Sequence, residues 1–82
     1  MKKITAAEFN EMKETAIDVF HYPKGNFWIV HSKTNNLFYA VRHKASQYWV
    51  SKSTKSFTTV MRAIINIENL TWQNPASQSI FY

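Results

Sequence analysis

The sequence predicts a single α+β domain in which a three-stranded antiparallel meander packs with two amphipathic helices, in the order helix, strand, strand, strand, helix. Three observations support this fold class. The chain has 82 residues, which suffices for one domain with one small core. Hydrophobic residues make up 45% of it and only one glycine is present, as expected of a folded chain. Runs of aromatic and β-branched residues lie between two stretches with helical spacing.

The first helix is predicted over about residues 5–20. Thr5 and Glu8 have capping-box spacing, in which both side chains satisfy free backbone N–H groups at a helix start. The apolar residues that follow recur at helical intervals: Phe9, Met12, Ala16, Ile17 and Phe20. The segment "YPKG" at 22–25 is expected to end this helix, because proline and glycine favour turns. Residues 1–4 are expected to form an N-terminal arm.

Three strands are predicted at 26–32, 37–44 and 47–53, separated by the turn-forming "KTNN" and by "AS". Loops with an even number of residues would place six side chains on one face: Trp28, Val30, Tyr39, Val41, Tyr48 and Val50. The opposite face would mix aromatic residues with cations, among them Phe38, Trp49, Arg42 and Lys44.

A second helix is predicted over about 57–68, with Ser56 or Thr58 as its cap. Phe57, Val60, Met61, Ile64 and either Ile65 or Ile67 form its apolar stripe. Residues 5–69 would form the body of one domain that spans 1–82, and the apolar end of segment 70–82 suggests a tail that docks on this body.

Charge is unevenly distributed along the chain. Its net charge is +5, and the segment 19–67 carries seven Lys and Arg residues and no carboxylate. Residues 1–18 carry three Lys and four carboxylates. A field of one sign attracts polyanions, although a basic balance also serves solubility. The leading expectation is a binding partner that is nucleic acid; the alternative partner is a protein of a nucleoprotein complex.

The candidate binding residues come from this acid-free segment. Single-stranded nucleic acid stacks its bases on aromatic rings while cations track the phosphates, which favours Phe38 and Trp49 beside Arg42 and Lys44. The alternative is that a helix covers this face, so that its aromatic residues are ordinary core. A second local candidate is "SKSTKS" at 51–56, where Lys52 and Lys55 precede a helix N-terminus that favours anions; here the alternative is a solvated loop. Lys33 and Arg62 complete the candidate set.

The predicted order of elements resembles that of the double-stranded-RNA-binding domain, in which basic residues at the start of the second helix contact phosphates. Lys52 and Lys55 lie near the corresponding place, but the signature Lys-Lys-x-Ala-Lys is absent. The order also resembles the amino-terminal domains of some transposon integrases and several small phage inhibitors, including anti-CRISPR proteins. These resemblances imply a small regulator or inhibitor of phage or mobile-element type, which acts on nucleic acid or on a host anti-phage complex. They assign no role to a particular residue.

Catalysis is not expected. His21, His31 and His43 have no neighbouring carboxylate in the sequence, and the chain lacks cysteine, so neither a triad nor a familiar zinc spacing is present. His31 and His43 could approach each other across a hairpin, but a pair without a third ligand is more often the polar rim of a sheet. No cofactor and no metal are predicted. The polar, acidic start of the chain does not fit a signal peptide, and no stretch is long and apolar enough to span a membrane, so a cytoplasmic location is expected. The oligomeric state is left open.

Overall fold

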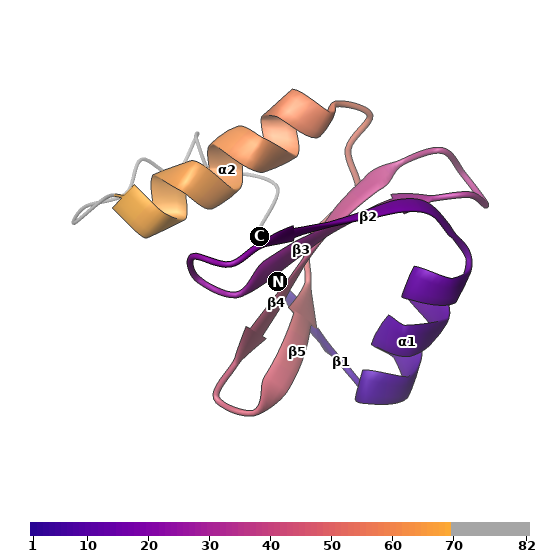
Figure 1. Cartoon of the computed structure of the whole chain (residues 1–82), viewed down its shortest axis with the longest axis horizontal. Coiled ribbons are helices and arrows are strands. Elements are labelled where there is room, and N and C mark those ends of the chain that lie inside the picture. Colours follow the sequence, from indigo (N-terminus) through magenta and orange to yellow (C-terminus); the bar gives the residue numbers. More distant parts are fainter. Residues whose placement is uncertain (70–82) are drawn as a thin grey trace.

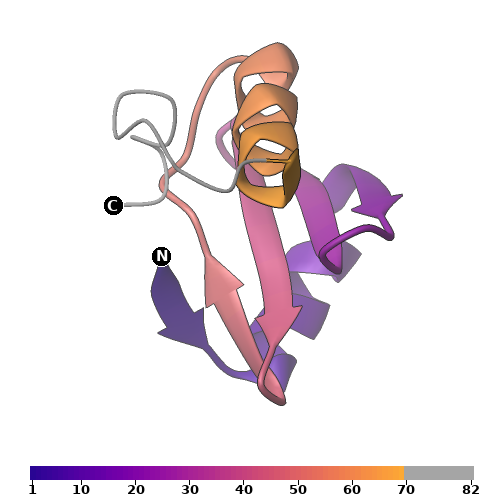
Figure 2. The ribbon, with the colours of Figure 1, turned by 90° about the vertical axis from the view of Figure 1, so that its left-hand side faces the viewer.

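The computed structural model describes residues 1–69, which form a five-stranded antiparallel sheet with one helix on each face (Figure 1). The elements in chain order are β1 (Lys2–Ile4), α1 (Ala6–Glu14), β2 (Ala16–Tyr22), β3 (Phe27–Ser32), β4 (Phe38–Lys44), β5 (Gln47–Val50) and α2 (Phe57–Asn69). The strands lie in the order β1-β5-β4-β3-β2, which Figure 2 shows from one edge of the sheet to the other. The predicted α+β class is confirmed. The predicted antiparallel meander is present as β3, β4 and β5, but β2 and β1 extend it on either side, so the sheet has five strands. The predicted order αβββα is wrong, because one strand precedes the first helix and another follows it.

The first correction concerns residues 15–22, which were predicted to continue the first helix. The helix α1 ends at Glu14, and Thr15 closes it by donating its backbone N–H and its hydroxyl to the Glu11 carbonyl, at 3.1 and 3.0 Å. Residues 16–22 then form β2, which pairs with β3 along its length apart from an irregularity between Ala16 and Asp18. The segment "YPKG" therefore belongs to the hairpin turn between β2 and β3, where Gly25 and Asn26 have φ of 76° and 58°.

The second correction concerns the predicted N-terminal arm. Residues 2–4 form β1, an edge strand that pairs with β5 in the register Lys2↔Val50, Lys3↔Trp49 and Ile4↔Tyr48. The capping box that follows β1 is confirmed, since the Glu8 N–H donates to the Thr5 hydroxyl at 3.0 Å and the Thr5 N–H donates to the Glu8 carboxylate at 3.1 Å. This box starts α1 directly after β1, so the chain crosses from the sheet edge onto one sheet face.

The predicted register of the three central strands is confirmed. Trp28 lies opposite Val41, Val41 lies opposite Val50, and Val30 lies opposite Tyr39, so these side chains share one face. On the other face Arg42 lies between Phe27 and Trp49. The register results from two turns with an even number of residues. One is the four-residue turn at 33–36, which the hydrogen bond from the Ser32 N–H to the Leu37 carbonyl closes, and the other is the two-residue turn at 45–46.

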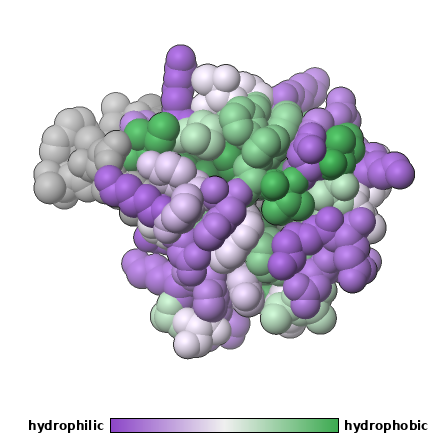
Figure 3. Space-filling model, viewed as in Figure 1, coloured by the Kyte–Doolittle hydropathy of each residue, from purple (hydrophilic) through white to green (hydrophobic). Residues whose placement is uncertain are grey.

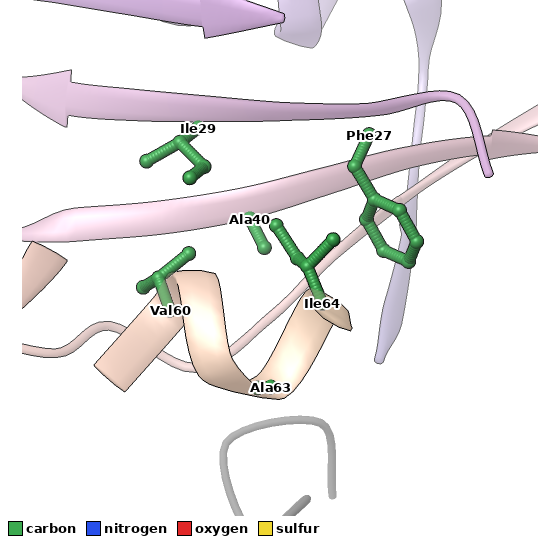
Figure 4. Close-up of a cluster of buried hydrophobic side chains, with 6 residues drawn as sticks. All are labelled: Phe27, Ile29, Ala40, Val60, Ala63 and Ile64. Atoms are coloured by element: carbon green, nitrogen blue, oxygen red, sulfur yellow. The ribbon is translucent and has the colours of Figure 1, made fainter. Parts of the chain in front are cut away.

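Helix α2 covers the face of the sheet that carries Phe27, Ile29 and Ala40 (Figure 4). Val60, Ala63 and Ile64 recur at helical spacing and are buried in this cluster, and Figure 4 shows Val60 and Ile64 pointing from α2 toward the strands. The predicted second helix and its apolar stripe are thus confirmed through Ile64. Ser56 caps the helix, because its hydroxyl accepts the Thr59 N–H at 3.2 Å.

Helix α1 covers the opposite face. Phe9 is its buried residue and packs with Ile4, Val30 and Val41. The Phe9 ring meets the rings of Trp28 and Tyr48 at centroid distances of 5.3 and 4.9 Å. The sheet is therefore the central layer between two small cores, one under each helix.

Within residues 1–69, no helix is both long enough and apolar enough to cross a membrane. The segment 70–82, which was predicted to be a docked tail, lies outside the described residues.

Candidate functional site

The two faces of the domain differ in charge. Glu8, Glu11 and Glu14 are exposed on α1, whereas α2 carries the exposed Arg62. The loop that leads into α2 carries the exposed Lys52 and Lys55. The uneven charge along the sequence thus becomes an uneven charge in space. The three carboxylates of α1 lie on one side of the sheet, and the cations of the loop and of α2 lie on the other, where Asp18 of β2 also lies.

The loop cations, which are Lys33, Lys52 and Lys55, lie at one end of the sheet. Phe38 begins β4 and exchanges hydrogen bonds with Thr54, at 2.8 and 3.0 Å, which holds the 51–56 loop beside the turn that carries Lys33. This end also holds the N-terminus of α2, as Figure 1 shows. All three Lys side chains are exposed, and a helix N-terminus favours an anion.

A local bulge displays Lys52. The Ser51 N–H donates to the Ala40 carbonyl at 2.8 Å, while Thr54 pairs with Phe38, so three steps along the loop match two steps along β4. The extra residue pushes Lys52 and Ser53 outward, as is typical of a β-bulge. The hydroxyl of Ser51, which is buried, secures this geometry by accepting the Ala40 N–H at 2.9 Å and donating to the Lys52 carbonyl at 2.9 Å.

Phe38 contributes packing at this end. It is half-buried, its ring stacks on the His31 imidazole at 4.1 Å, and it meets the Phe57 ring edge-on at 5.8 Å. Phe57 in turn meets Phe20 at 5.1 Å. Phe38 is therefore part of the packing under α2, as expected from the alternative in which a helix covers this face. Its ring connects the strands to the first turn of α2.

The hairpin group, which is Arg42, Lys44 and Trp49, lies at the other end of the same face, beside the β4–β5 turn (Figure 1). Trp49 is half-buried and lies between Lys3 and Arg42 in the strand register. The Arg42 guanidinium lies over the Phe27 ring, 4.8 Å from its centroid. Arg42 lies four residue steps after Phe38 along β4, so the two groups are roughly 13 Å apart. Arg62 lies on the exposed side of α2, the helix that covers this same face.

Lys3 was missed as a candidate because residues 1–4 were predicted to be an arm. Only the pairing of β1 with β5 brings Lys3 beside Trp49. A three-residue strand leaves no periodic signal in a sequence, and the two Lys residues before Ile4 were the one available hint.

His31 lies on the α2 face of the sheet, whereas His21 and His43 lie on the α1 face, where both contact the side-chain amide of Asn26, at 3.5 and 3.4 Å. Each stacks on the aromatic residue opposite it: His21 on Trp28 at 4.5 Å, His31 on Phe38 at 4.1 Å and His43 on Tyr48 at 4.5 Å. His31 and His43 do not approach each other, because they lie at opposite ends of the β3–β4 pair and on opposite faces. Among the described residues, no three His, Asp or Glu side chains lie close enough together to hold a metal ion.

The acidic side of the sheet contains a hollow of about 480 Å³ between α1 and the strands. Its lining includes Lys2, Glu8, Glu11 and Tyr39. The Glu8 carboxylate already accepts the Thr5 N–H in the capping box. None of the eight candidate residues lines this hollow.

Comparison of the chain with models of protein families, with curated proteins and with solved structures gave no match.

Proposed function

We propose that this domain binds nucleic acid, without a catalytic step, through the basic side of its sheet. The observation that carries the proposal is the charge separation between the two faces. The three carboxylates of α1 lie on the side opposite the loop cations, so a polyanion that approaches the α2 side avoids them. The acidic residues that remain on the α2 side are Asp18 on β2 and Glu68 in α2, against the three loop cations and Arg62.

The dimensions of the basic side suit a nucleic acid strand. From Phe38 to Lys44 the strand β4 extends for six residue steps, or roughly 20 Å. That length corresponds to about six phosphates along one strand of a duplex. The loop cations and the hairpin group, with Arg62 on α2, would then contact phosphates at both ends of this interval. Such contacts position the ligand without selecting its sequence.

Trp49 is the aromatic candidate for base contact. Unlike Phe38, it belongs to neither of the two buried clusters, and it is flanked by Lys3 and Arg42 on the neighbouring strands. An aromatic ring between two cations suits an unpaired base, because the base can stack while its phosphates contact the cations. We therefore expect single-stranded DNA or RNA to bind more tightly than duplex.

The test is a fluorescence-anisotropy titration of labelled single-stranded DNA, single-stranded RNA and duplex DNA at several salt concentrations. One phosphate contact for each of the six candidate cations predicts an affinity that falls on the order of 1,000-fold between 50 and 200 mM salt. The double variant Lys52→Glu/Lys55→Glu should weaken binding to all sequences alike. It should also reduce the slope of log affinity against log salt by about two.

The matched control is Lys2→Glu/Lys13→Glu, which changes the net charge equally on side chains of the acidic side. Lys2 lines the hollow under α1, and the Lys13 ammonium lies 4.4 Å from the centre of the Phe9 ring. Equal losses for both double variants would show that only net charge matters and would remove the basic side as the site. Absence of binding by the unaltered protein, or an affinity that hardly changes with salt, would contradict the proposal and favour a protein partner.

A further inference from the structure

The two edges of the sheet differ in how they are protected. Strand β1 has three residues, two of which are the exposed Lys2 and Lys3. Short edge strands rich in lysine resist pairing with other strands. Strand β2 has seven residues with neither lysine nor proline, and among the described residues no strand pairs with its outer edge. The β1 edge is therefore protected against pairing with another strand, whereas the β2 edge, called the open edge below, is not.

The open edge is apolar. Four large apolar side chains of the described residues are notably exposed, and three of them lie on β2: Ile17 at 50%, Phe20 at 44% and Val19 at 39%. Figure 3, which views the molecule from this edge, shows apolar residues gathered in a band across the face. Exposed apolar groups that gather in this way mark contact surfaces.

The backbone of β2 is available for strand pairing. The Ser32 N–H bonds to Leu37, and the His43 N–H bonds to the Asn26 carbonyl, so even-numbered residues of β3 bond toward β4. Odd-numbered residues of β3 then face β2, opposite Asp18, Phe20 and Tyr22. By alternation, Val19 and His21 direct their N–H and C=O groups away from the sheet.

We infer that β2 pairs with β2 of a second copy of this chain, antiparallel and about a two-fold axis near Phe20. Two copies that each carry +5 repel one another, so a self-contact must avoid their cations. Strand β2 meets this condition because it contains no Lys or Arg, and Asp18 is its only carboxylate. Pairing about Phe20 places Val19 opposite His21 of the second copy, so that their outward groups bond, and places the two Phe20 rings side by side.

The symmetry has a consequence for the basic sides. A two-fold axis between neighbouring antiparallel strands of one sheet is perpendicular to that sheet. Both α2 helices then lie on the same side of a ten-stranded sheet, so the two sets of loop cations face the same direction. This inference does not depend on what the basic side binds.

The test is the mass of the full chain in solution, measured by sedimentation equilibrium over a range of concentrations. The unaltered protein should have twice the chain mass of 9.6 kDa. Val19→Lys places a cation on the open edge and should raise the dimer dissociation constant at least about tenfold. Ile65→Lys is the matched control, since Ile65 is similarly exposed, at 37%, but lies on α2; it should leave the dimer intact.

Disulfide cross-linking tests where the two copies meet, which the measured mass alone does not show. The chain has no cysteine, so Phe20→Cys introduces a single thiol that should form a disulfide between copies at the two-fold axis, whereas Ile65→Cys should not. An unaltered protein that stays monomeric up to about 0.5 mM would overturn the inference, and so would a dimer that survives Val19→Lys. Circular dichroism of each variant checks that the fold is kept.

Discussion

The attachment of α2 to the sheet depends on which of two adjacent isoleucines faces inward. Ile64 is fully buried against the cluster of Phe27, Ile29 and Ala40, whereas Ile65 is 37% exposed. The substitution Ile64→Ala should therefore cost about 3–4 kcal/mol of unfolding free energy, through lost burial and the cavity left behind. Ile65→Ala should cost less than about 1 kcal/mol. Both substitutions change helix propensity equally, so this contribution cancels in the comparison.

Urea denaturation followed by circular dichroism measures both values. An 82-residue domain has about 4–12 kcal/mol of stability, so Ile64→Ala removes a large share of it. With a slope near 1–2 kcal/mol per molar urea, the midpoint should fall by about 2 M for Ile64→Ala and by less than about 1 M for Ile65→Ala. Equal shifts, or a larger shift for Ile65→Ala, would refute the packing of α2 described above and with it the display of Arg62 on the outer side.

Two further predictions concern the β4–β5 hairpin. Its turn holds Ala45 and Ser46 at φ of 55° and 61°, a region that favours glycine and asparagine, so replacing them with Asn and Gly should stabilise the domain by about 1 kcal/mol. A melting temperature that stays constant or falls would contradict this. Trp49→Ala should cost about 1–2 kcal/mol of stability, below the 3–5 kcal/mol of a fully buried ring, and about 1–3 kcal/mol of affinity for single-stranded nucleic acid. A variant that loses stability but keeps its affinity would exclude Trp49 from the binding surface.

The strands that the sequence predicts well are those with a periodic signal on both sides of a short turn. Residues 27–32, 38–44 and 47–50 carry alternating aromatic and β-branched side chains, and even-length turns preserve their register. The capping box at Thr5 and the stripe of α2 were also visible, because both depend on fixed local spacings. Local rules therefore account for most of the central layer.

The first helix was predicted too long because residues 16–20 fit both the spacing of a helix and the composition of a strand. Ala16, Ile17 and Phe20 continue the helical spacing of Phe9, yet they also belong to a β-branched and aromatic run. Pairing with β3 decides the outcome, and this contact between distant elements has no local signature. The error also hid the exposed edge of β2, since a helix there would have buried Phe20 on its apolar stripe.

The sequence suggested two local candidates, the sheet face with Phe38, Trp49, Arg42 and Lys44 and the loop with Lys52 and Lys55, and the fold divides the first of them. The alternative in which a helix covers Phe38 was visible in the sequence, but the bulge that exposes Lys52 was not. This bulge depends on the pairing of Phe38 with Thr54, between a strand and a loop that runs beside it. Position along the chain could therefore suggest the composition of the site but not its shape.

The chain order explains why charge along the sequence becomes charge on one side of the sheet. The acidic segment enters from the β1 edge and forms α1 on one face, and the chain then crosses to the far edge as β2. It returns through β3, β4 and β5 before α2 covers the opposite face. The acidic helix α1 and the loop that carries Lys52 and Lys55 therefore lie on opposite sides of the sheet. A protein that needed charge only for solubility would gain nothing from this separation, whereas a surface for a polyanion requires that carboxylates be held away from it.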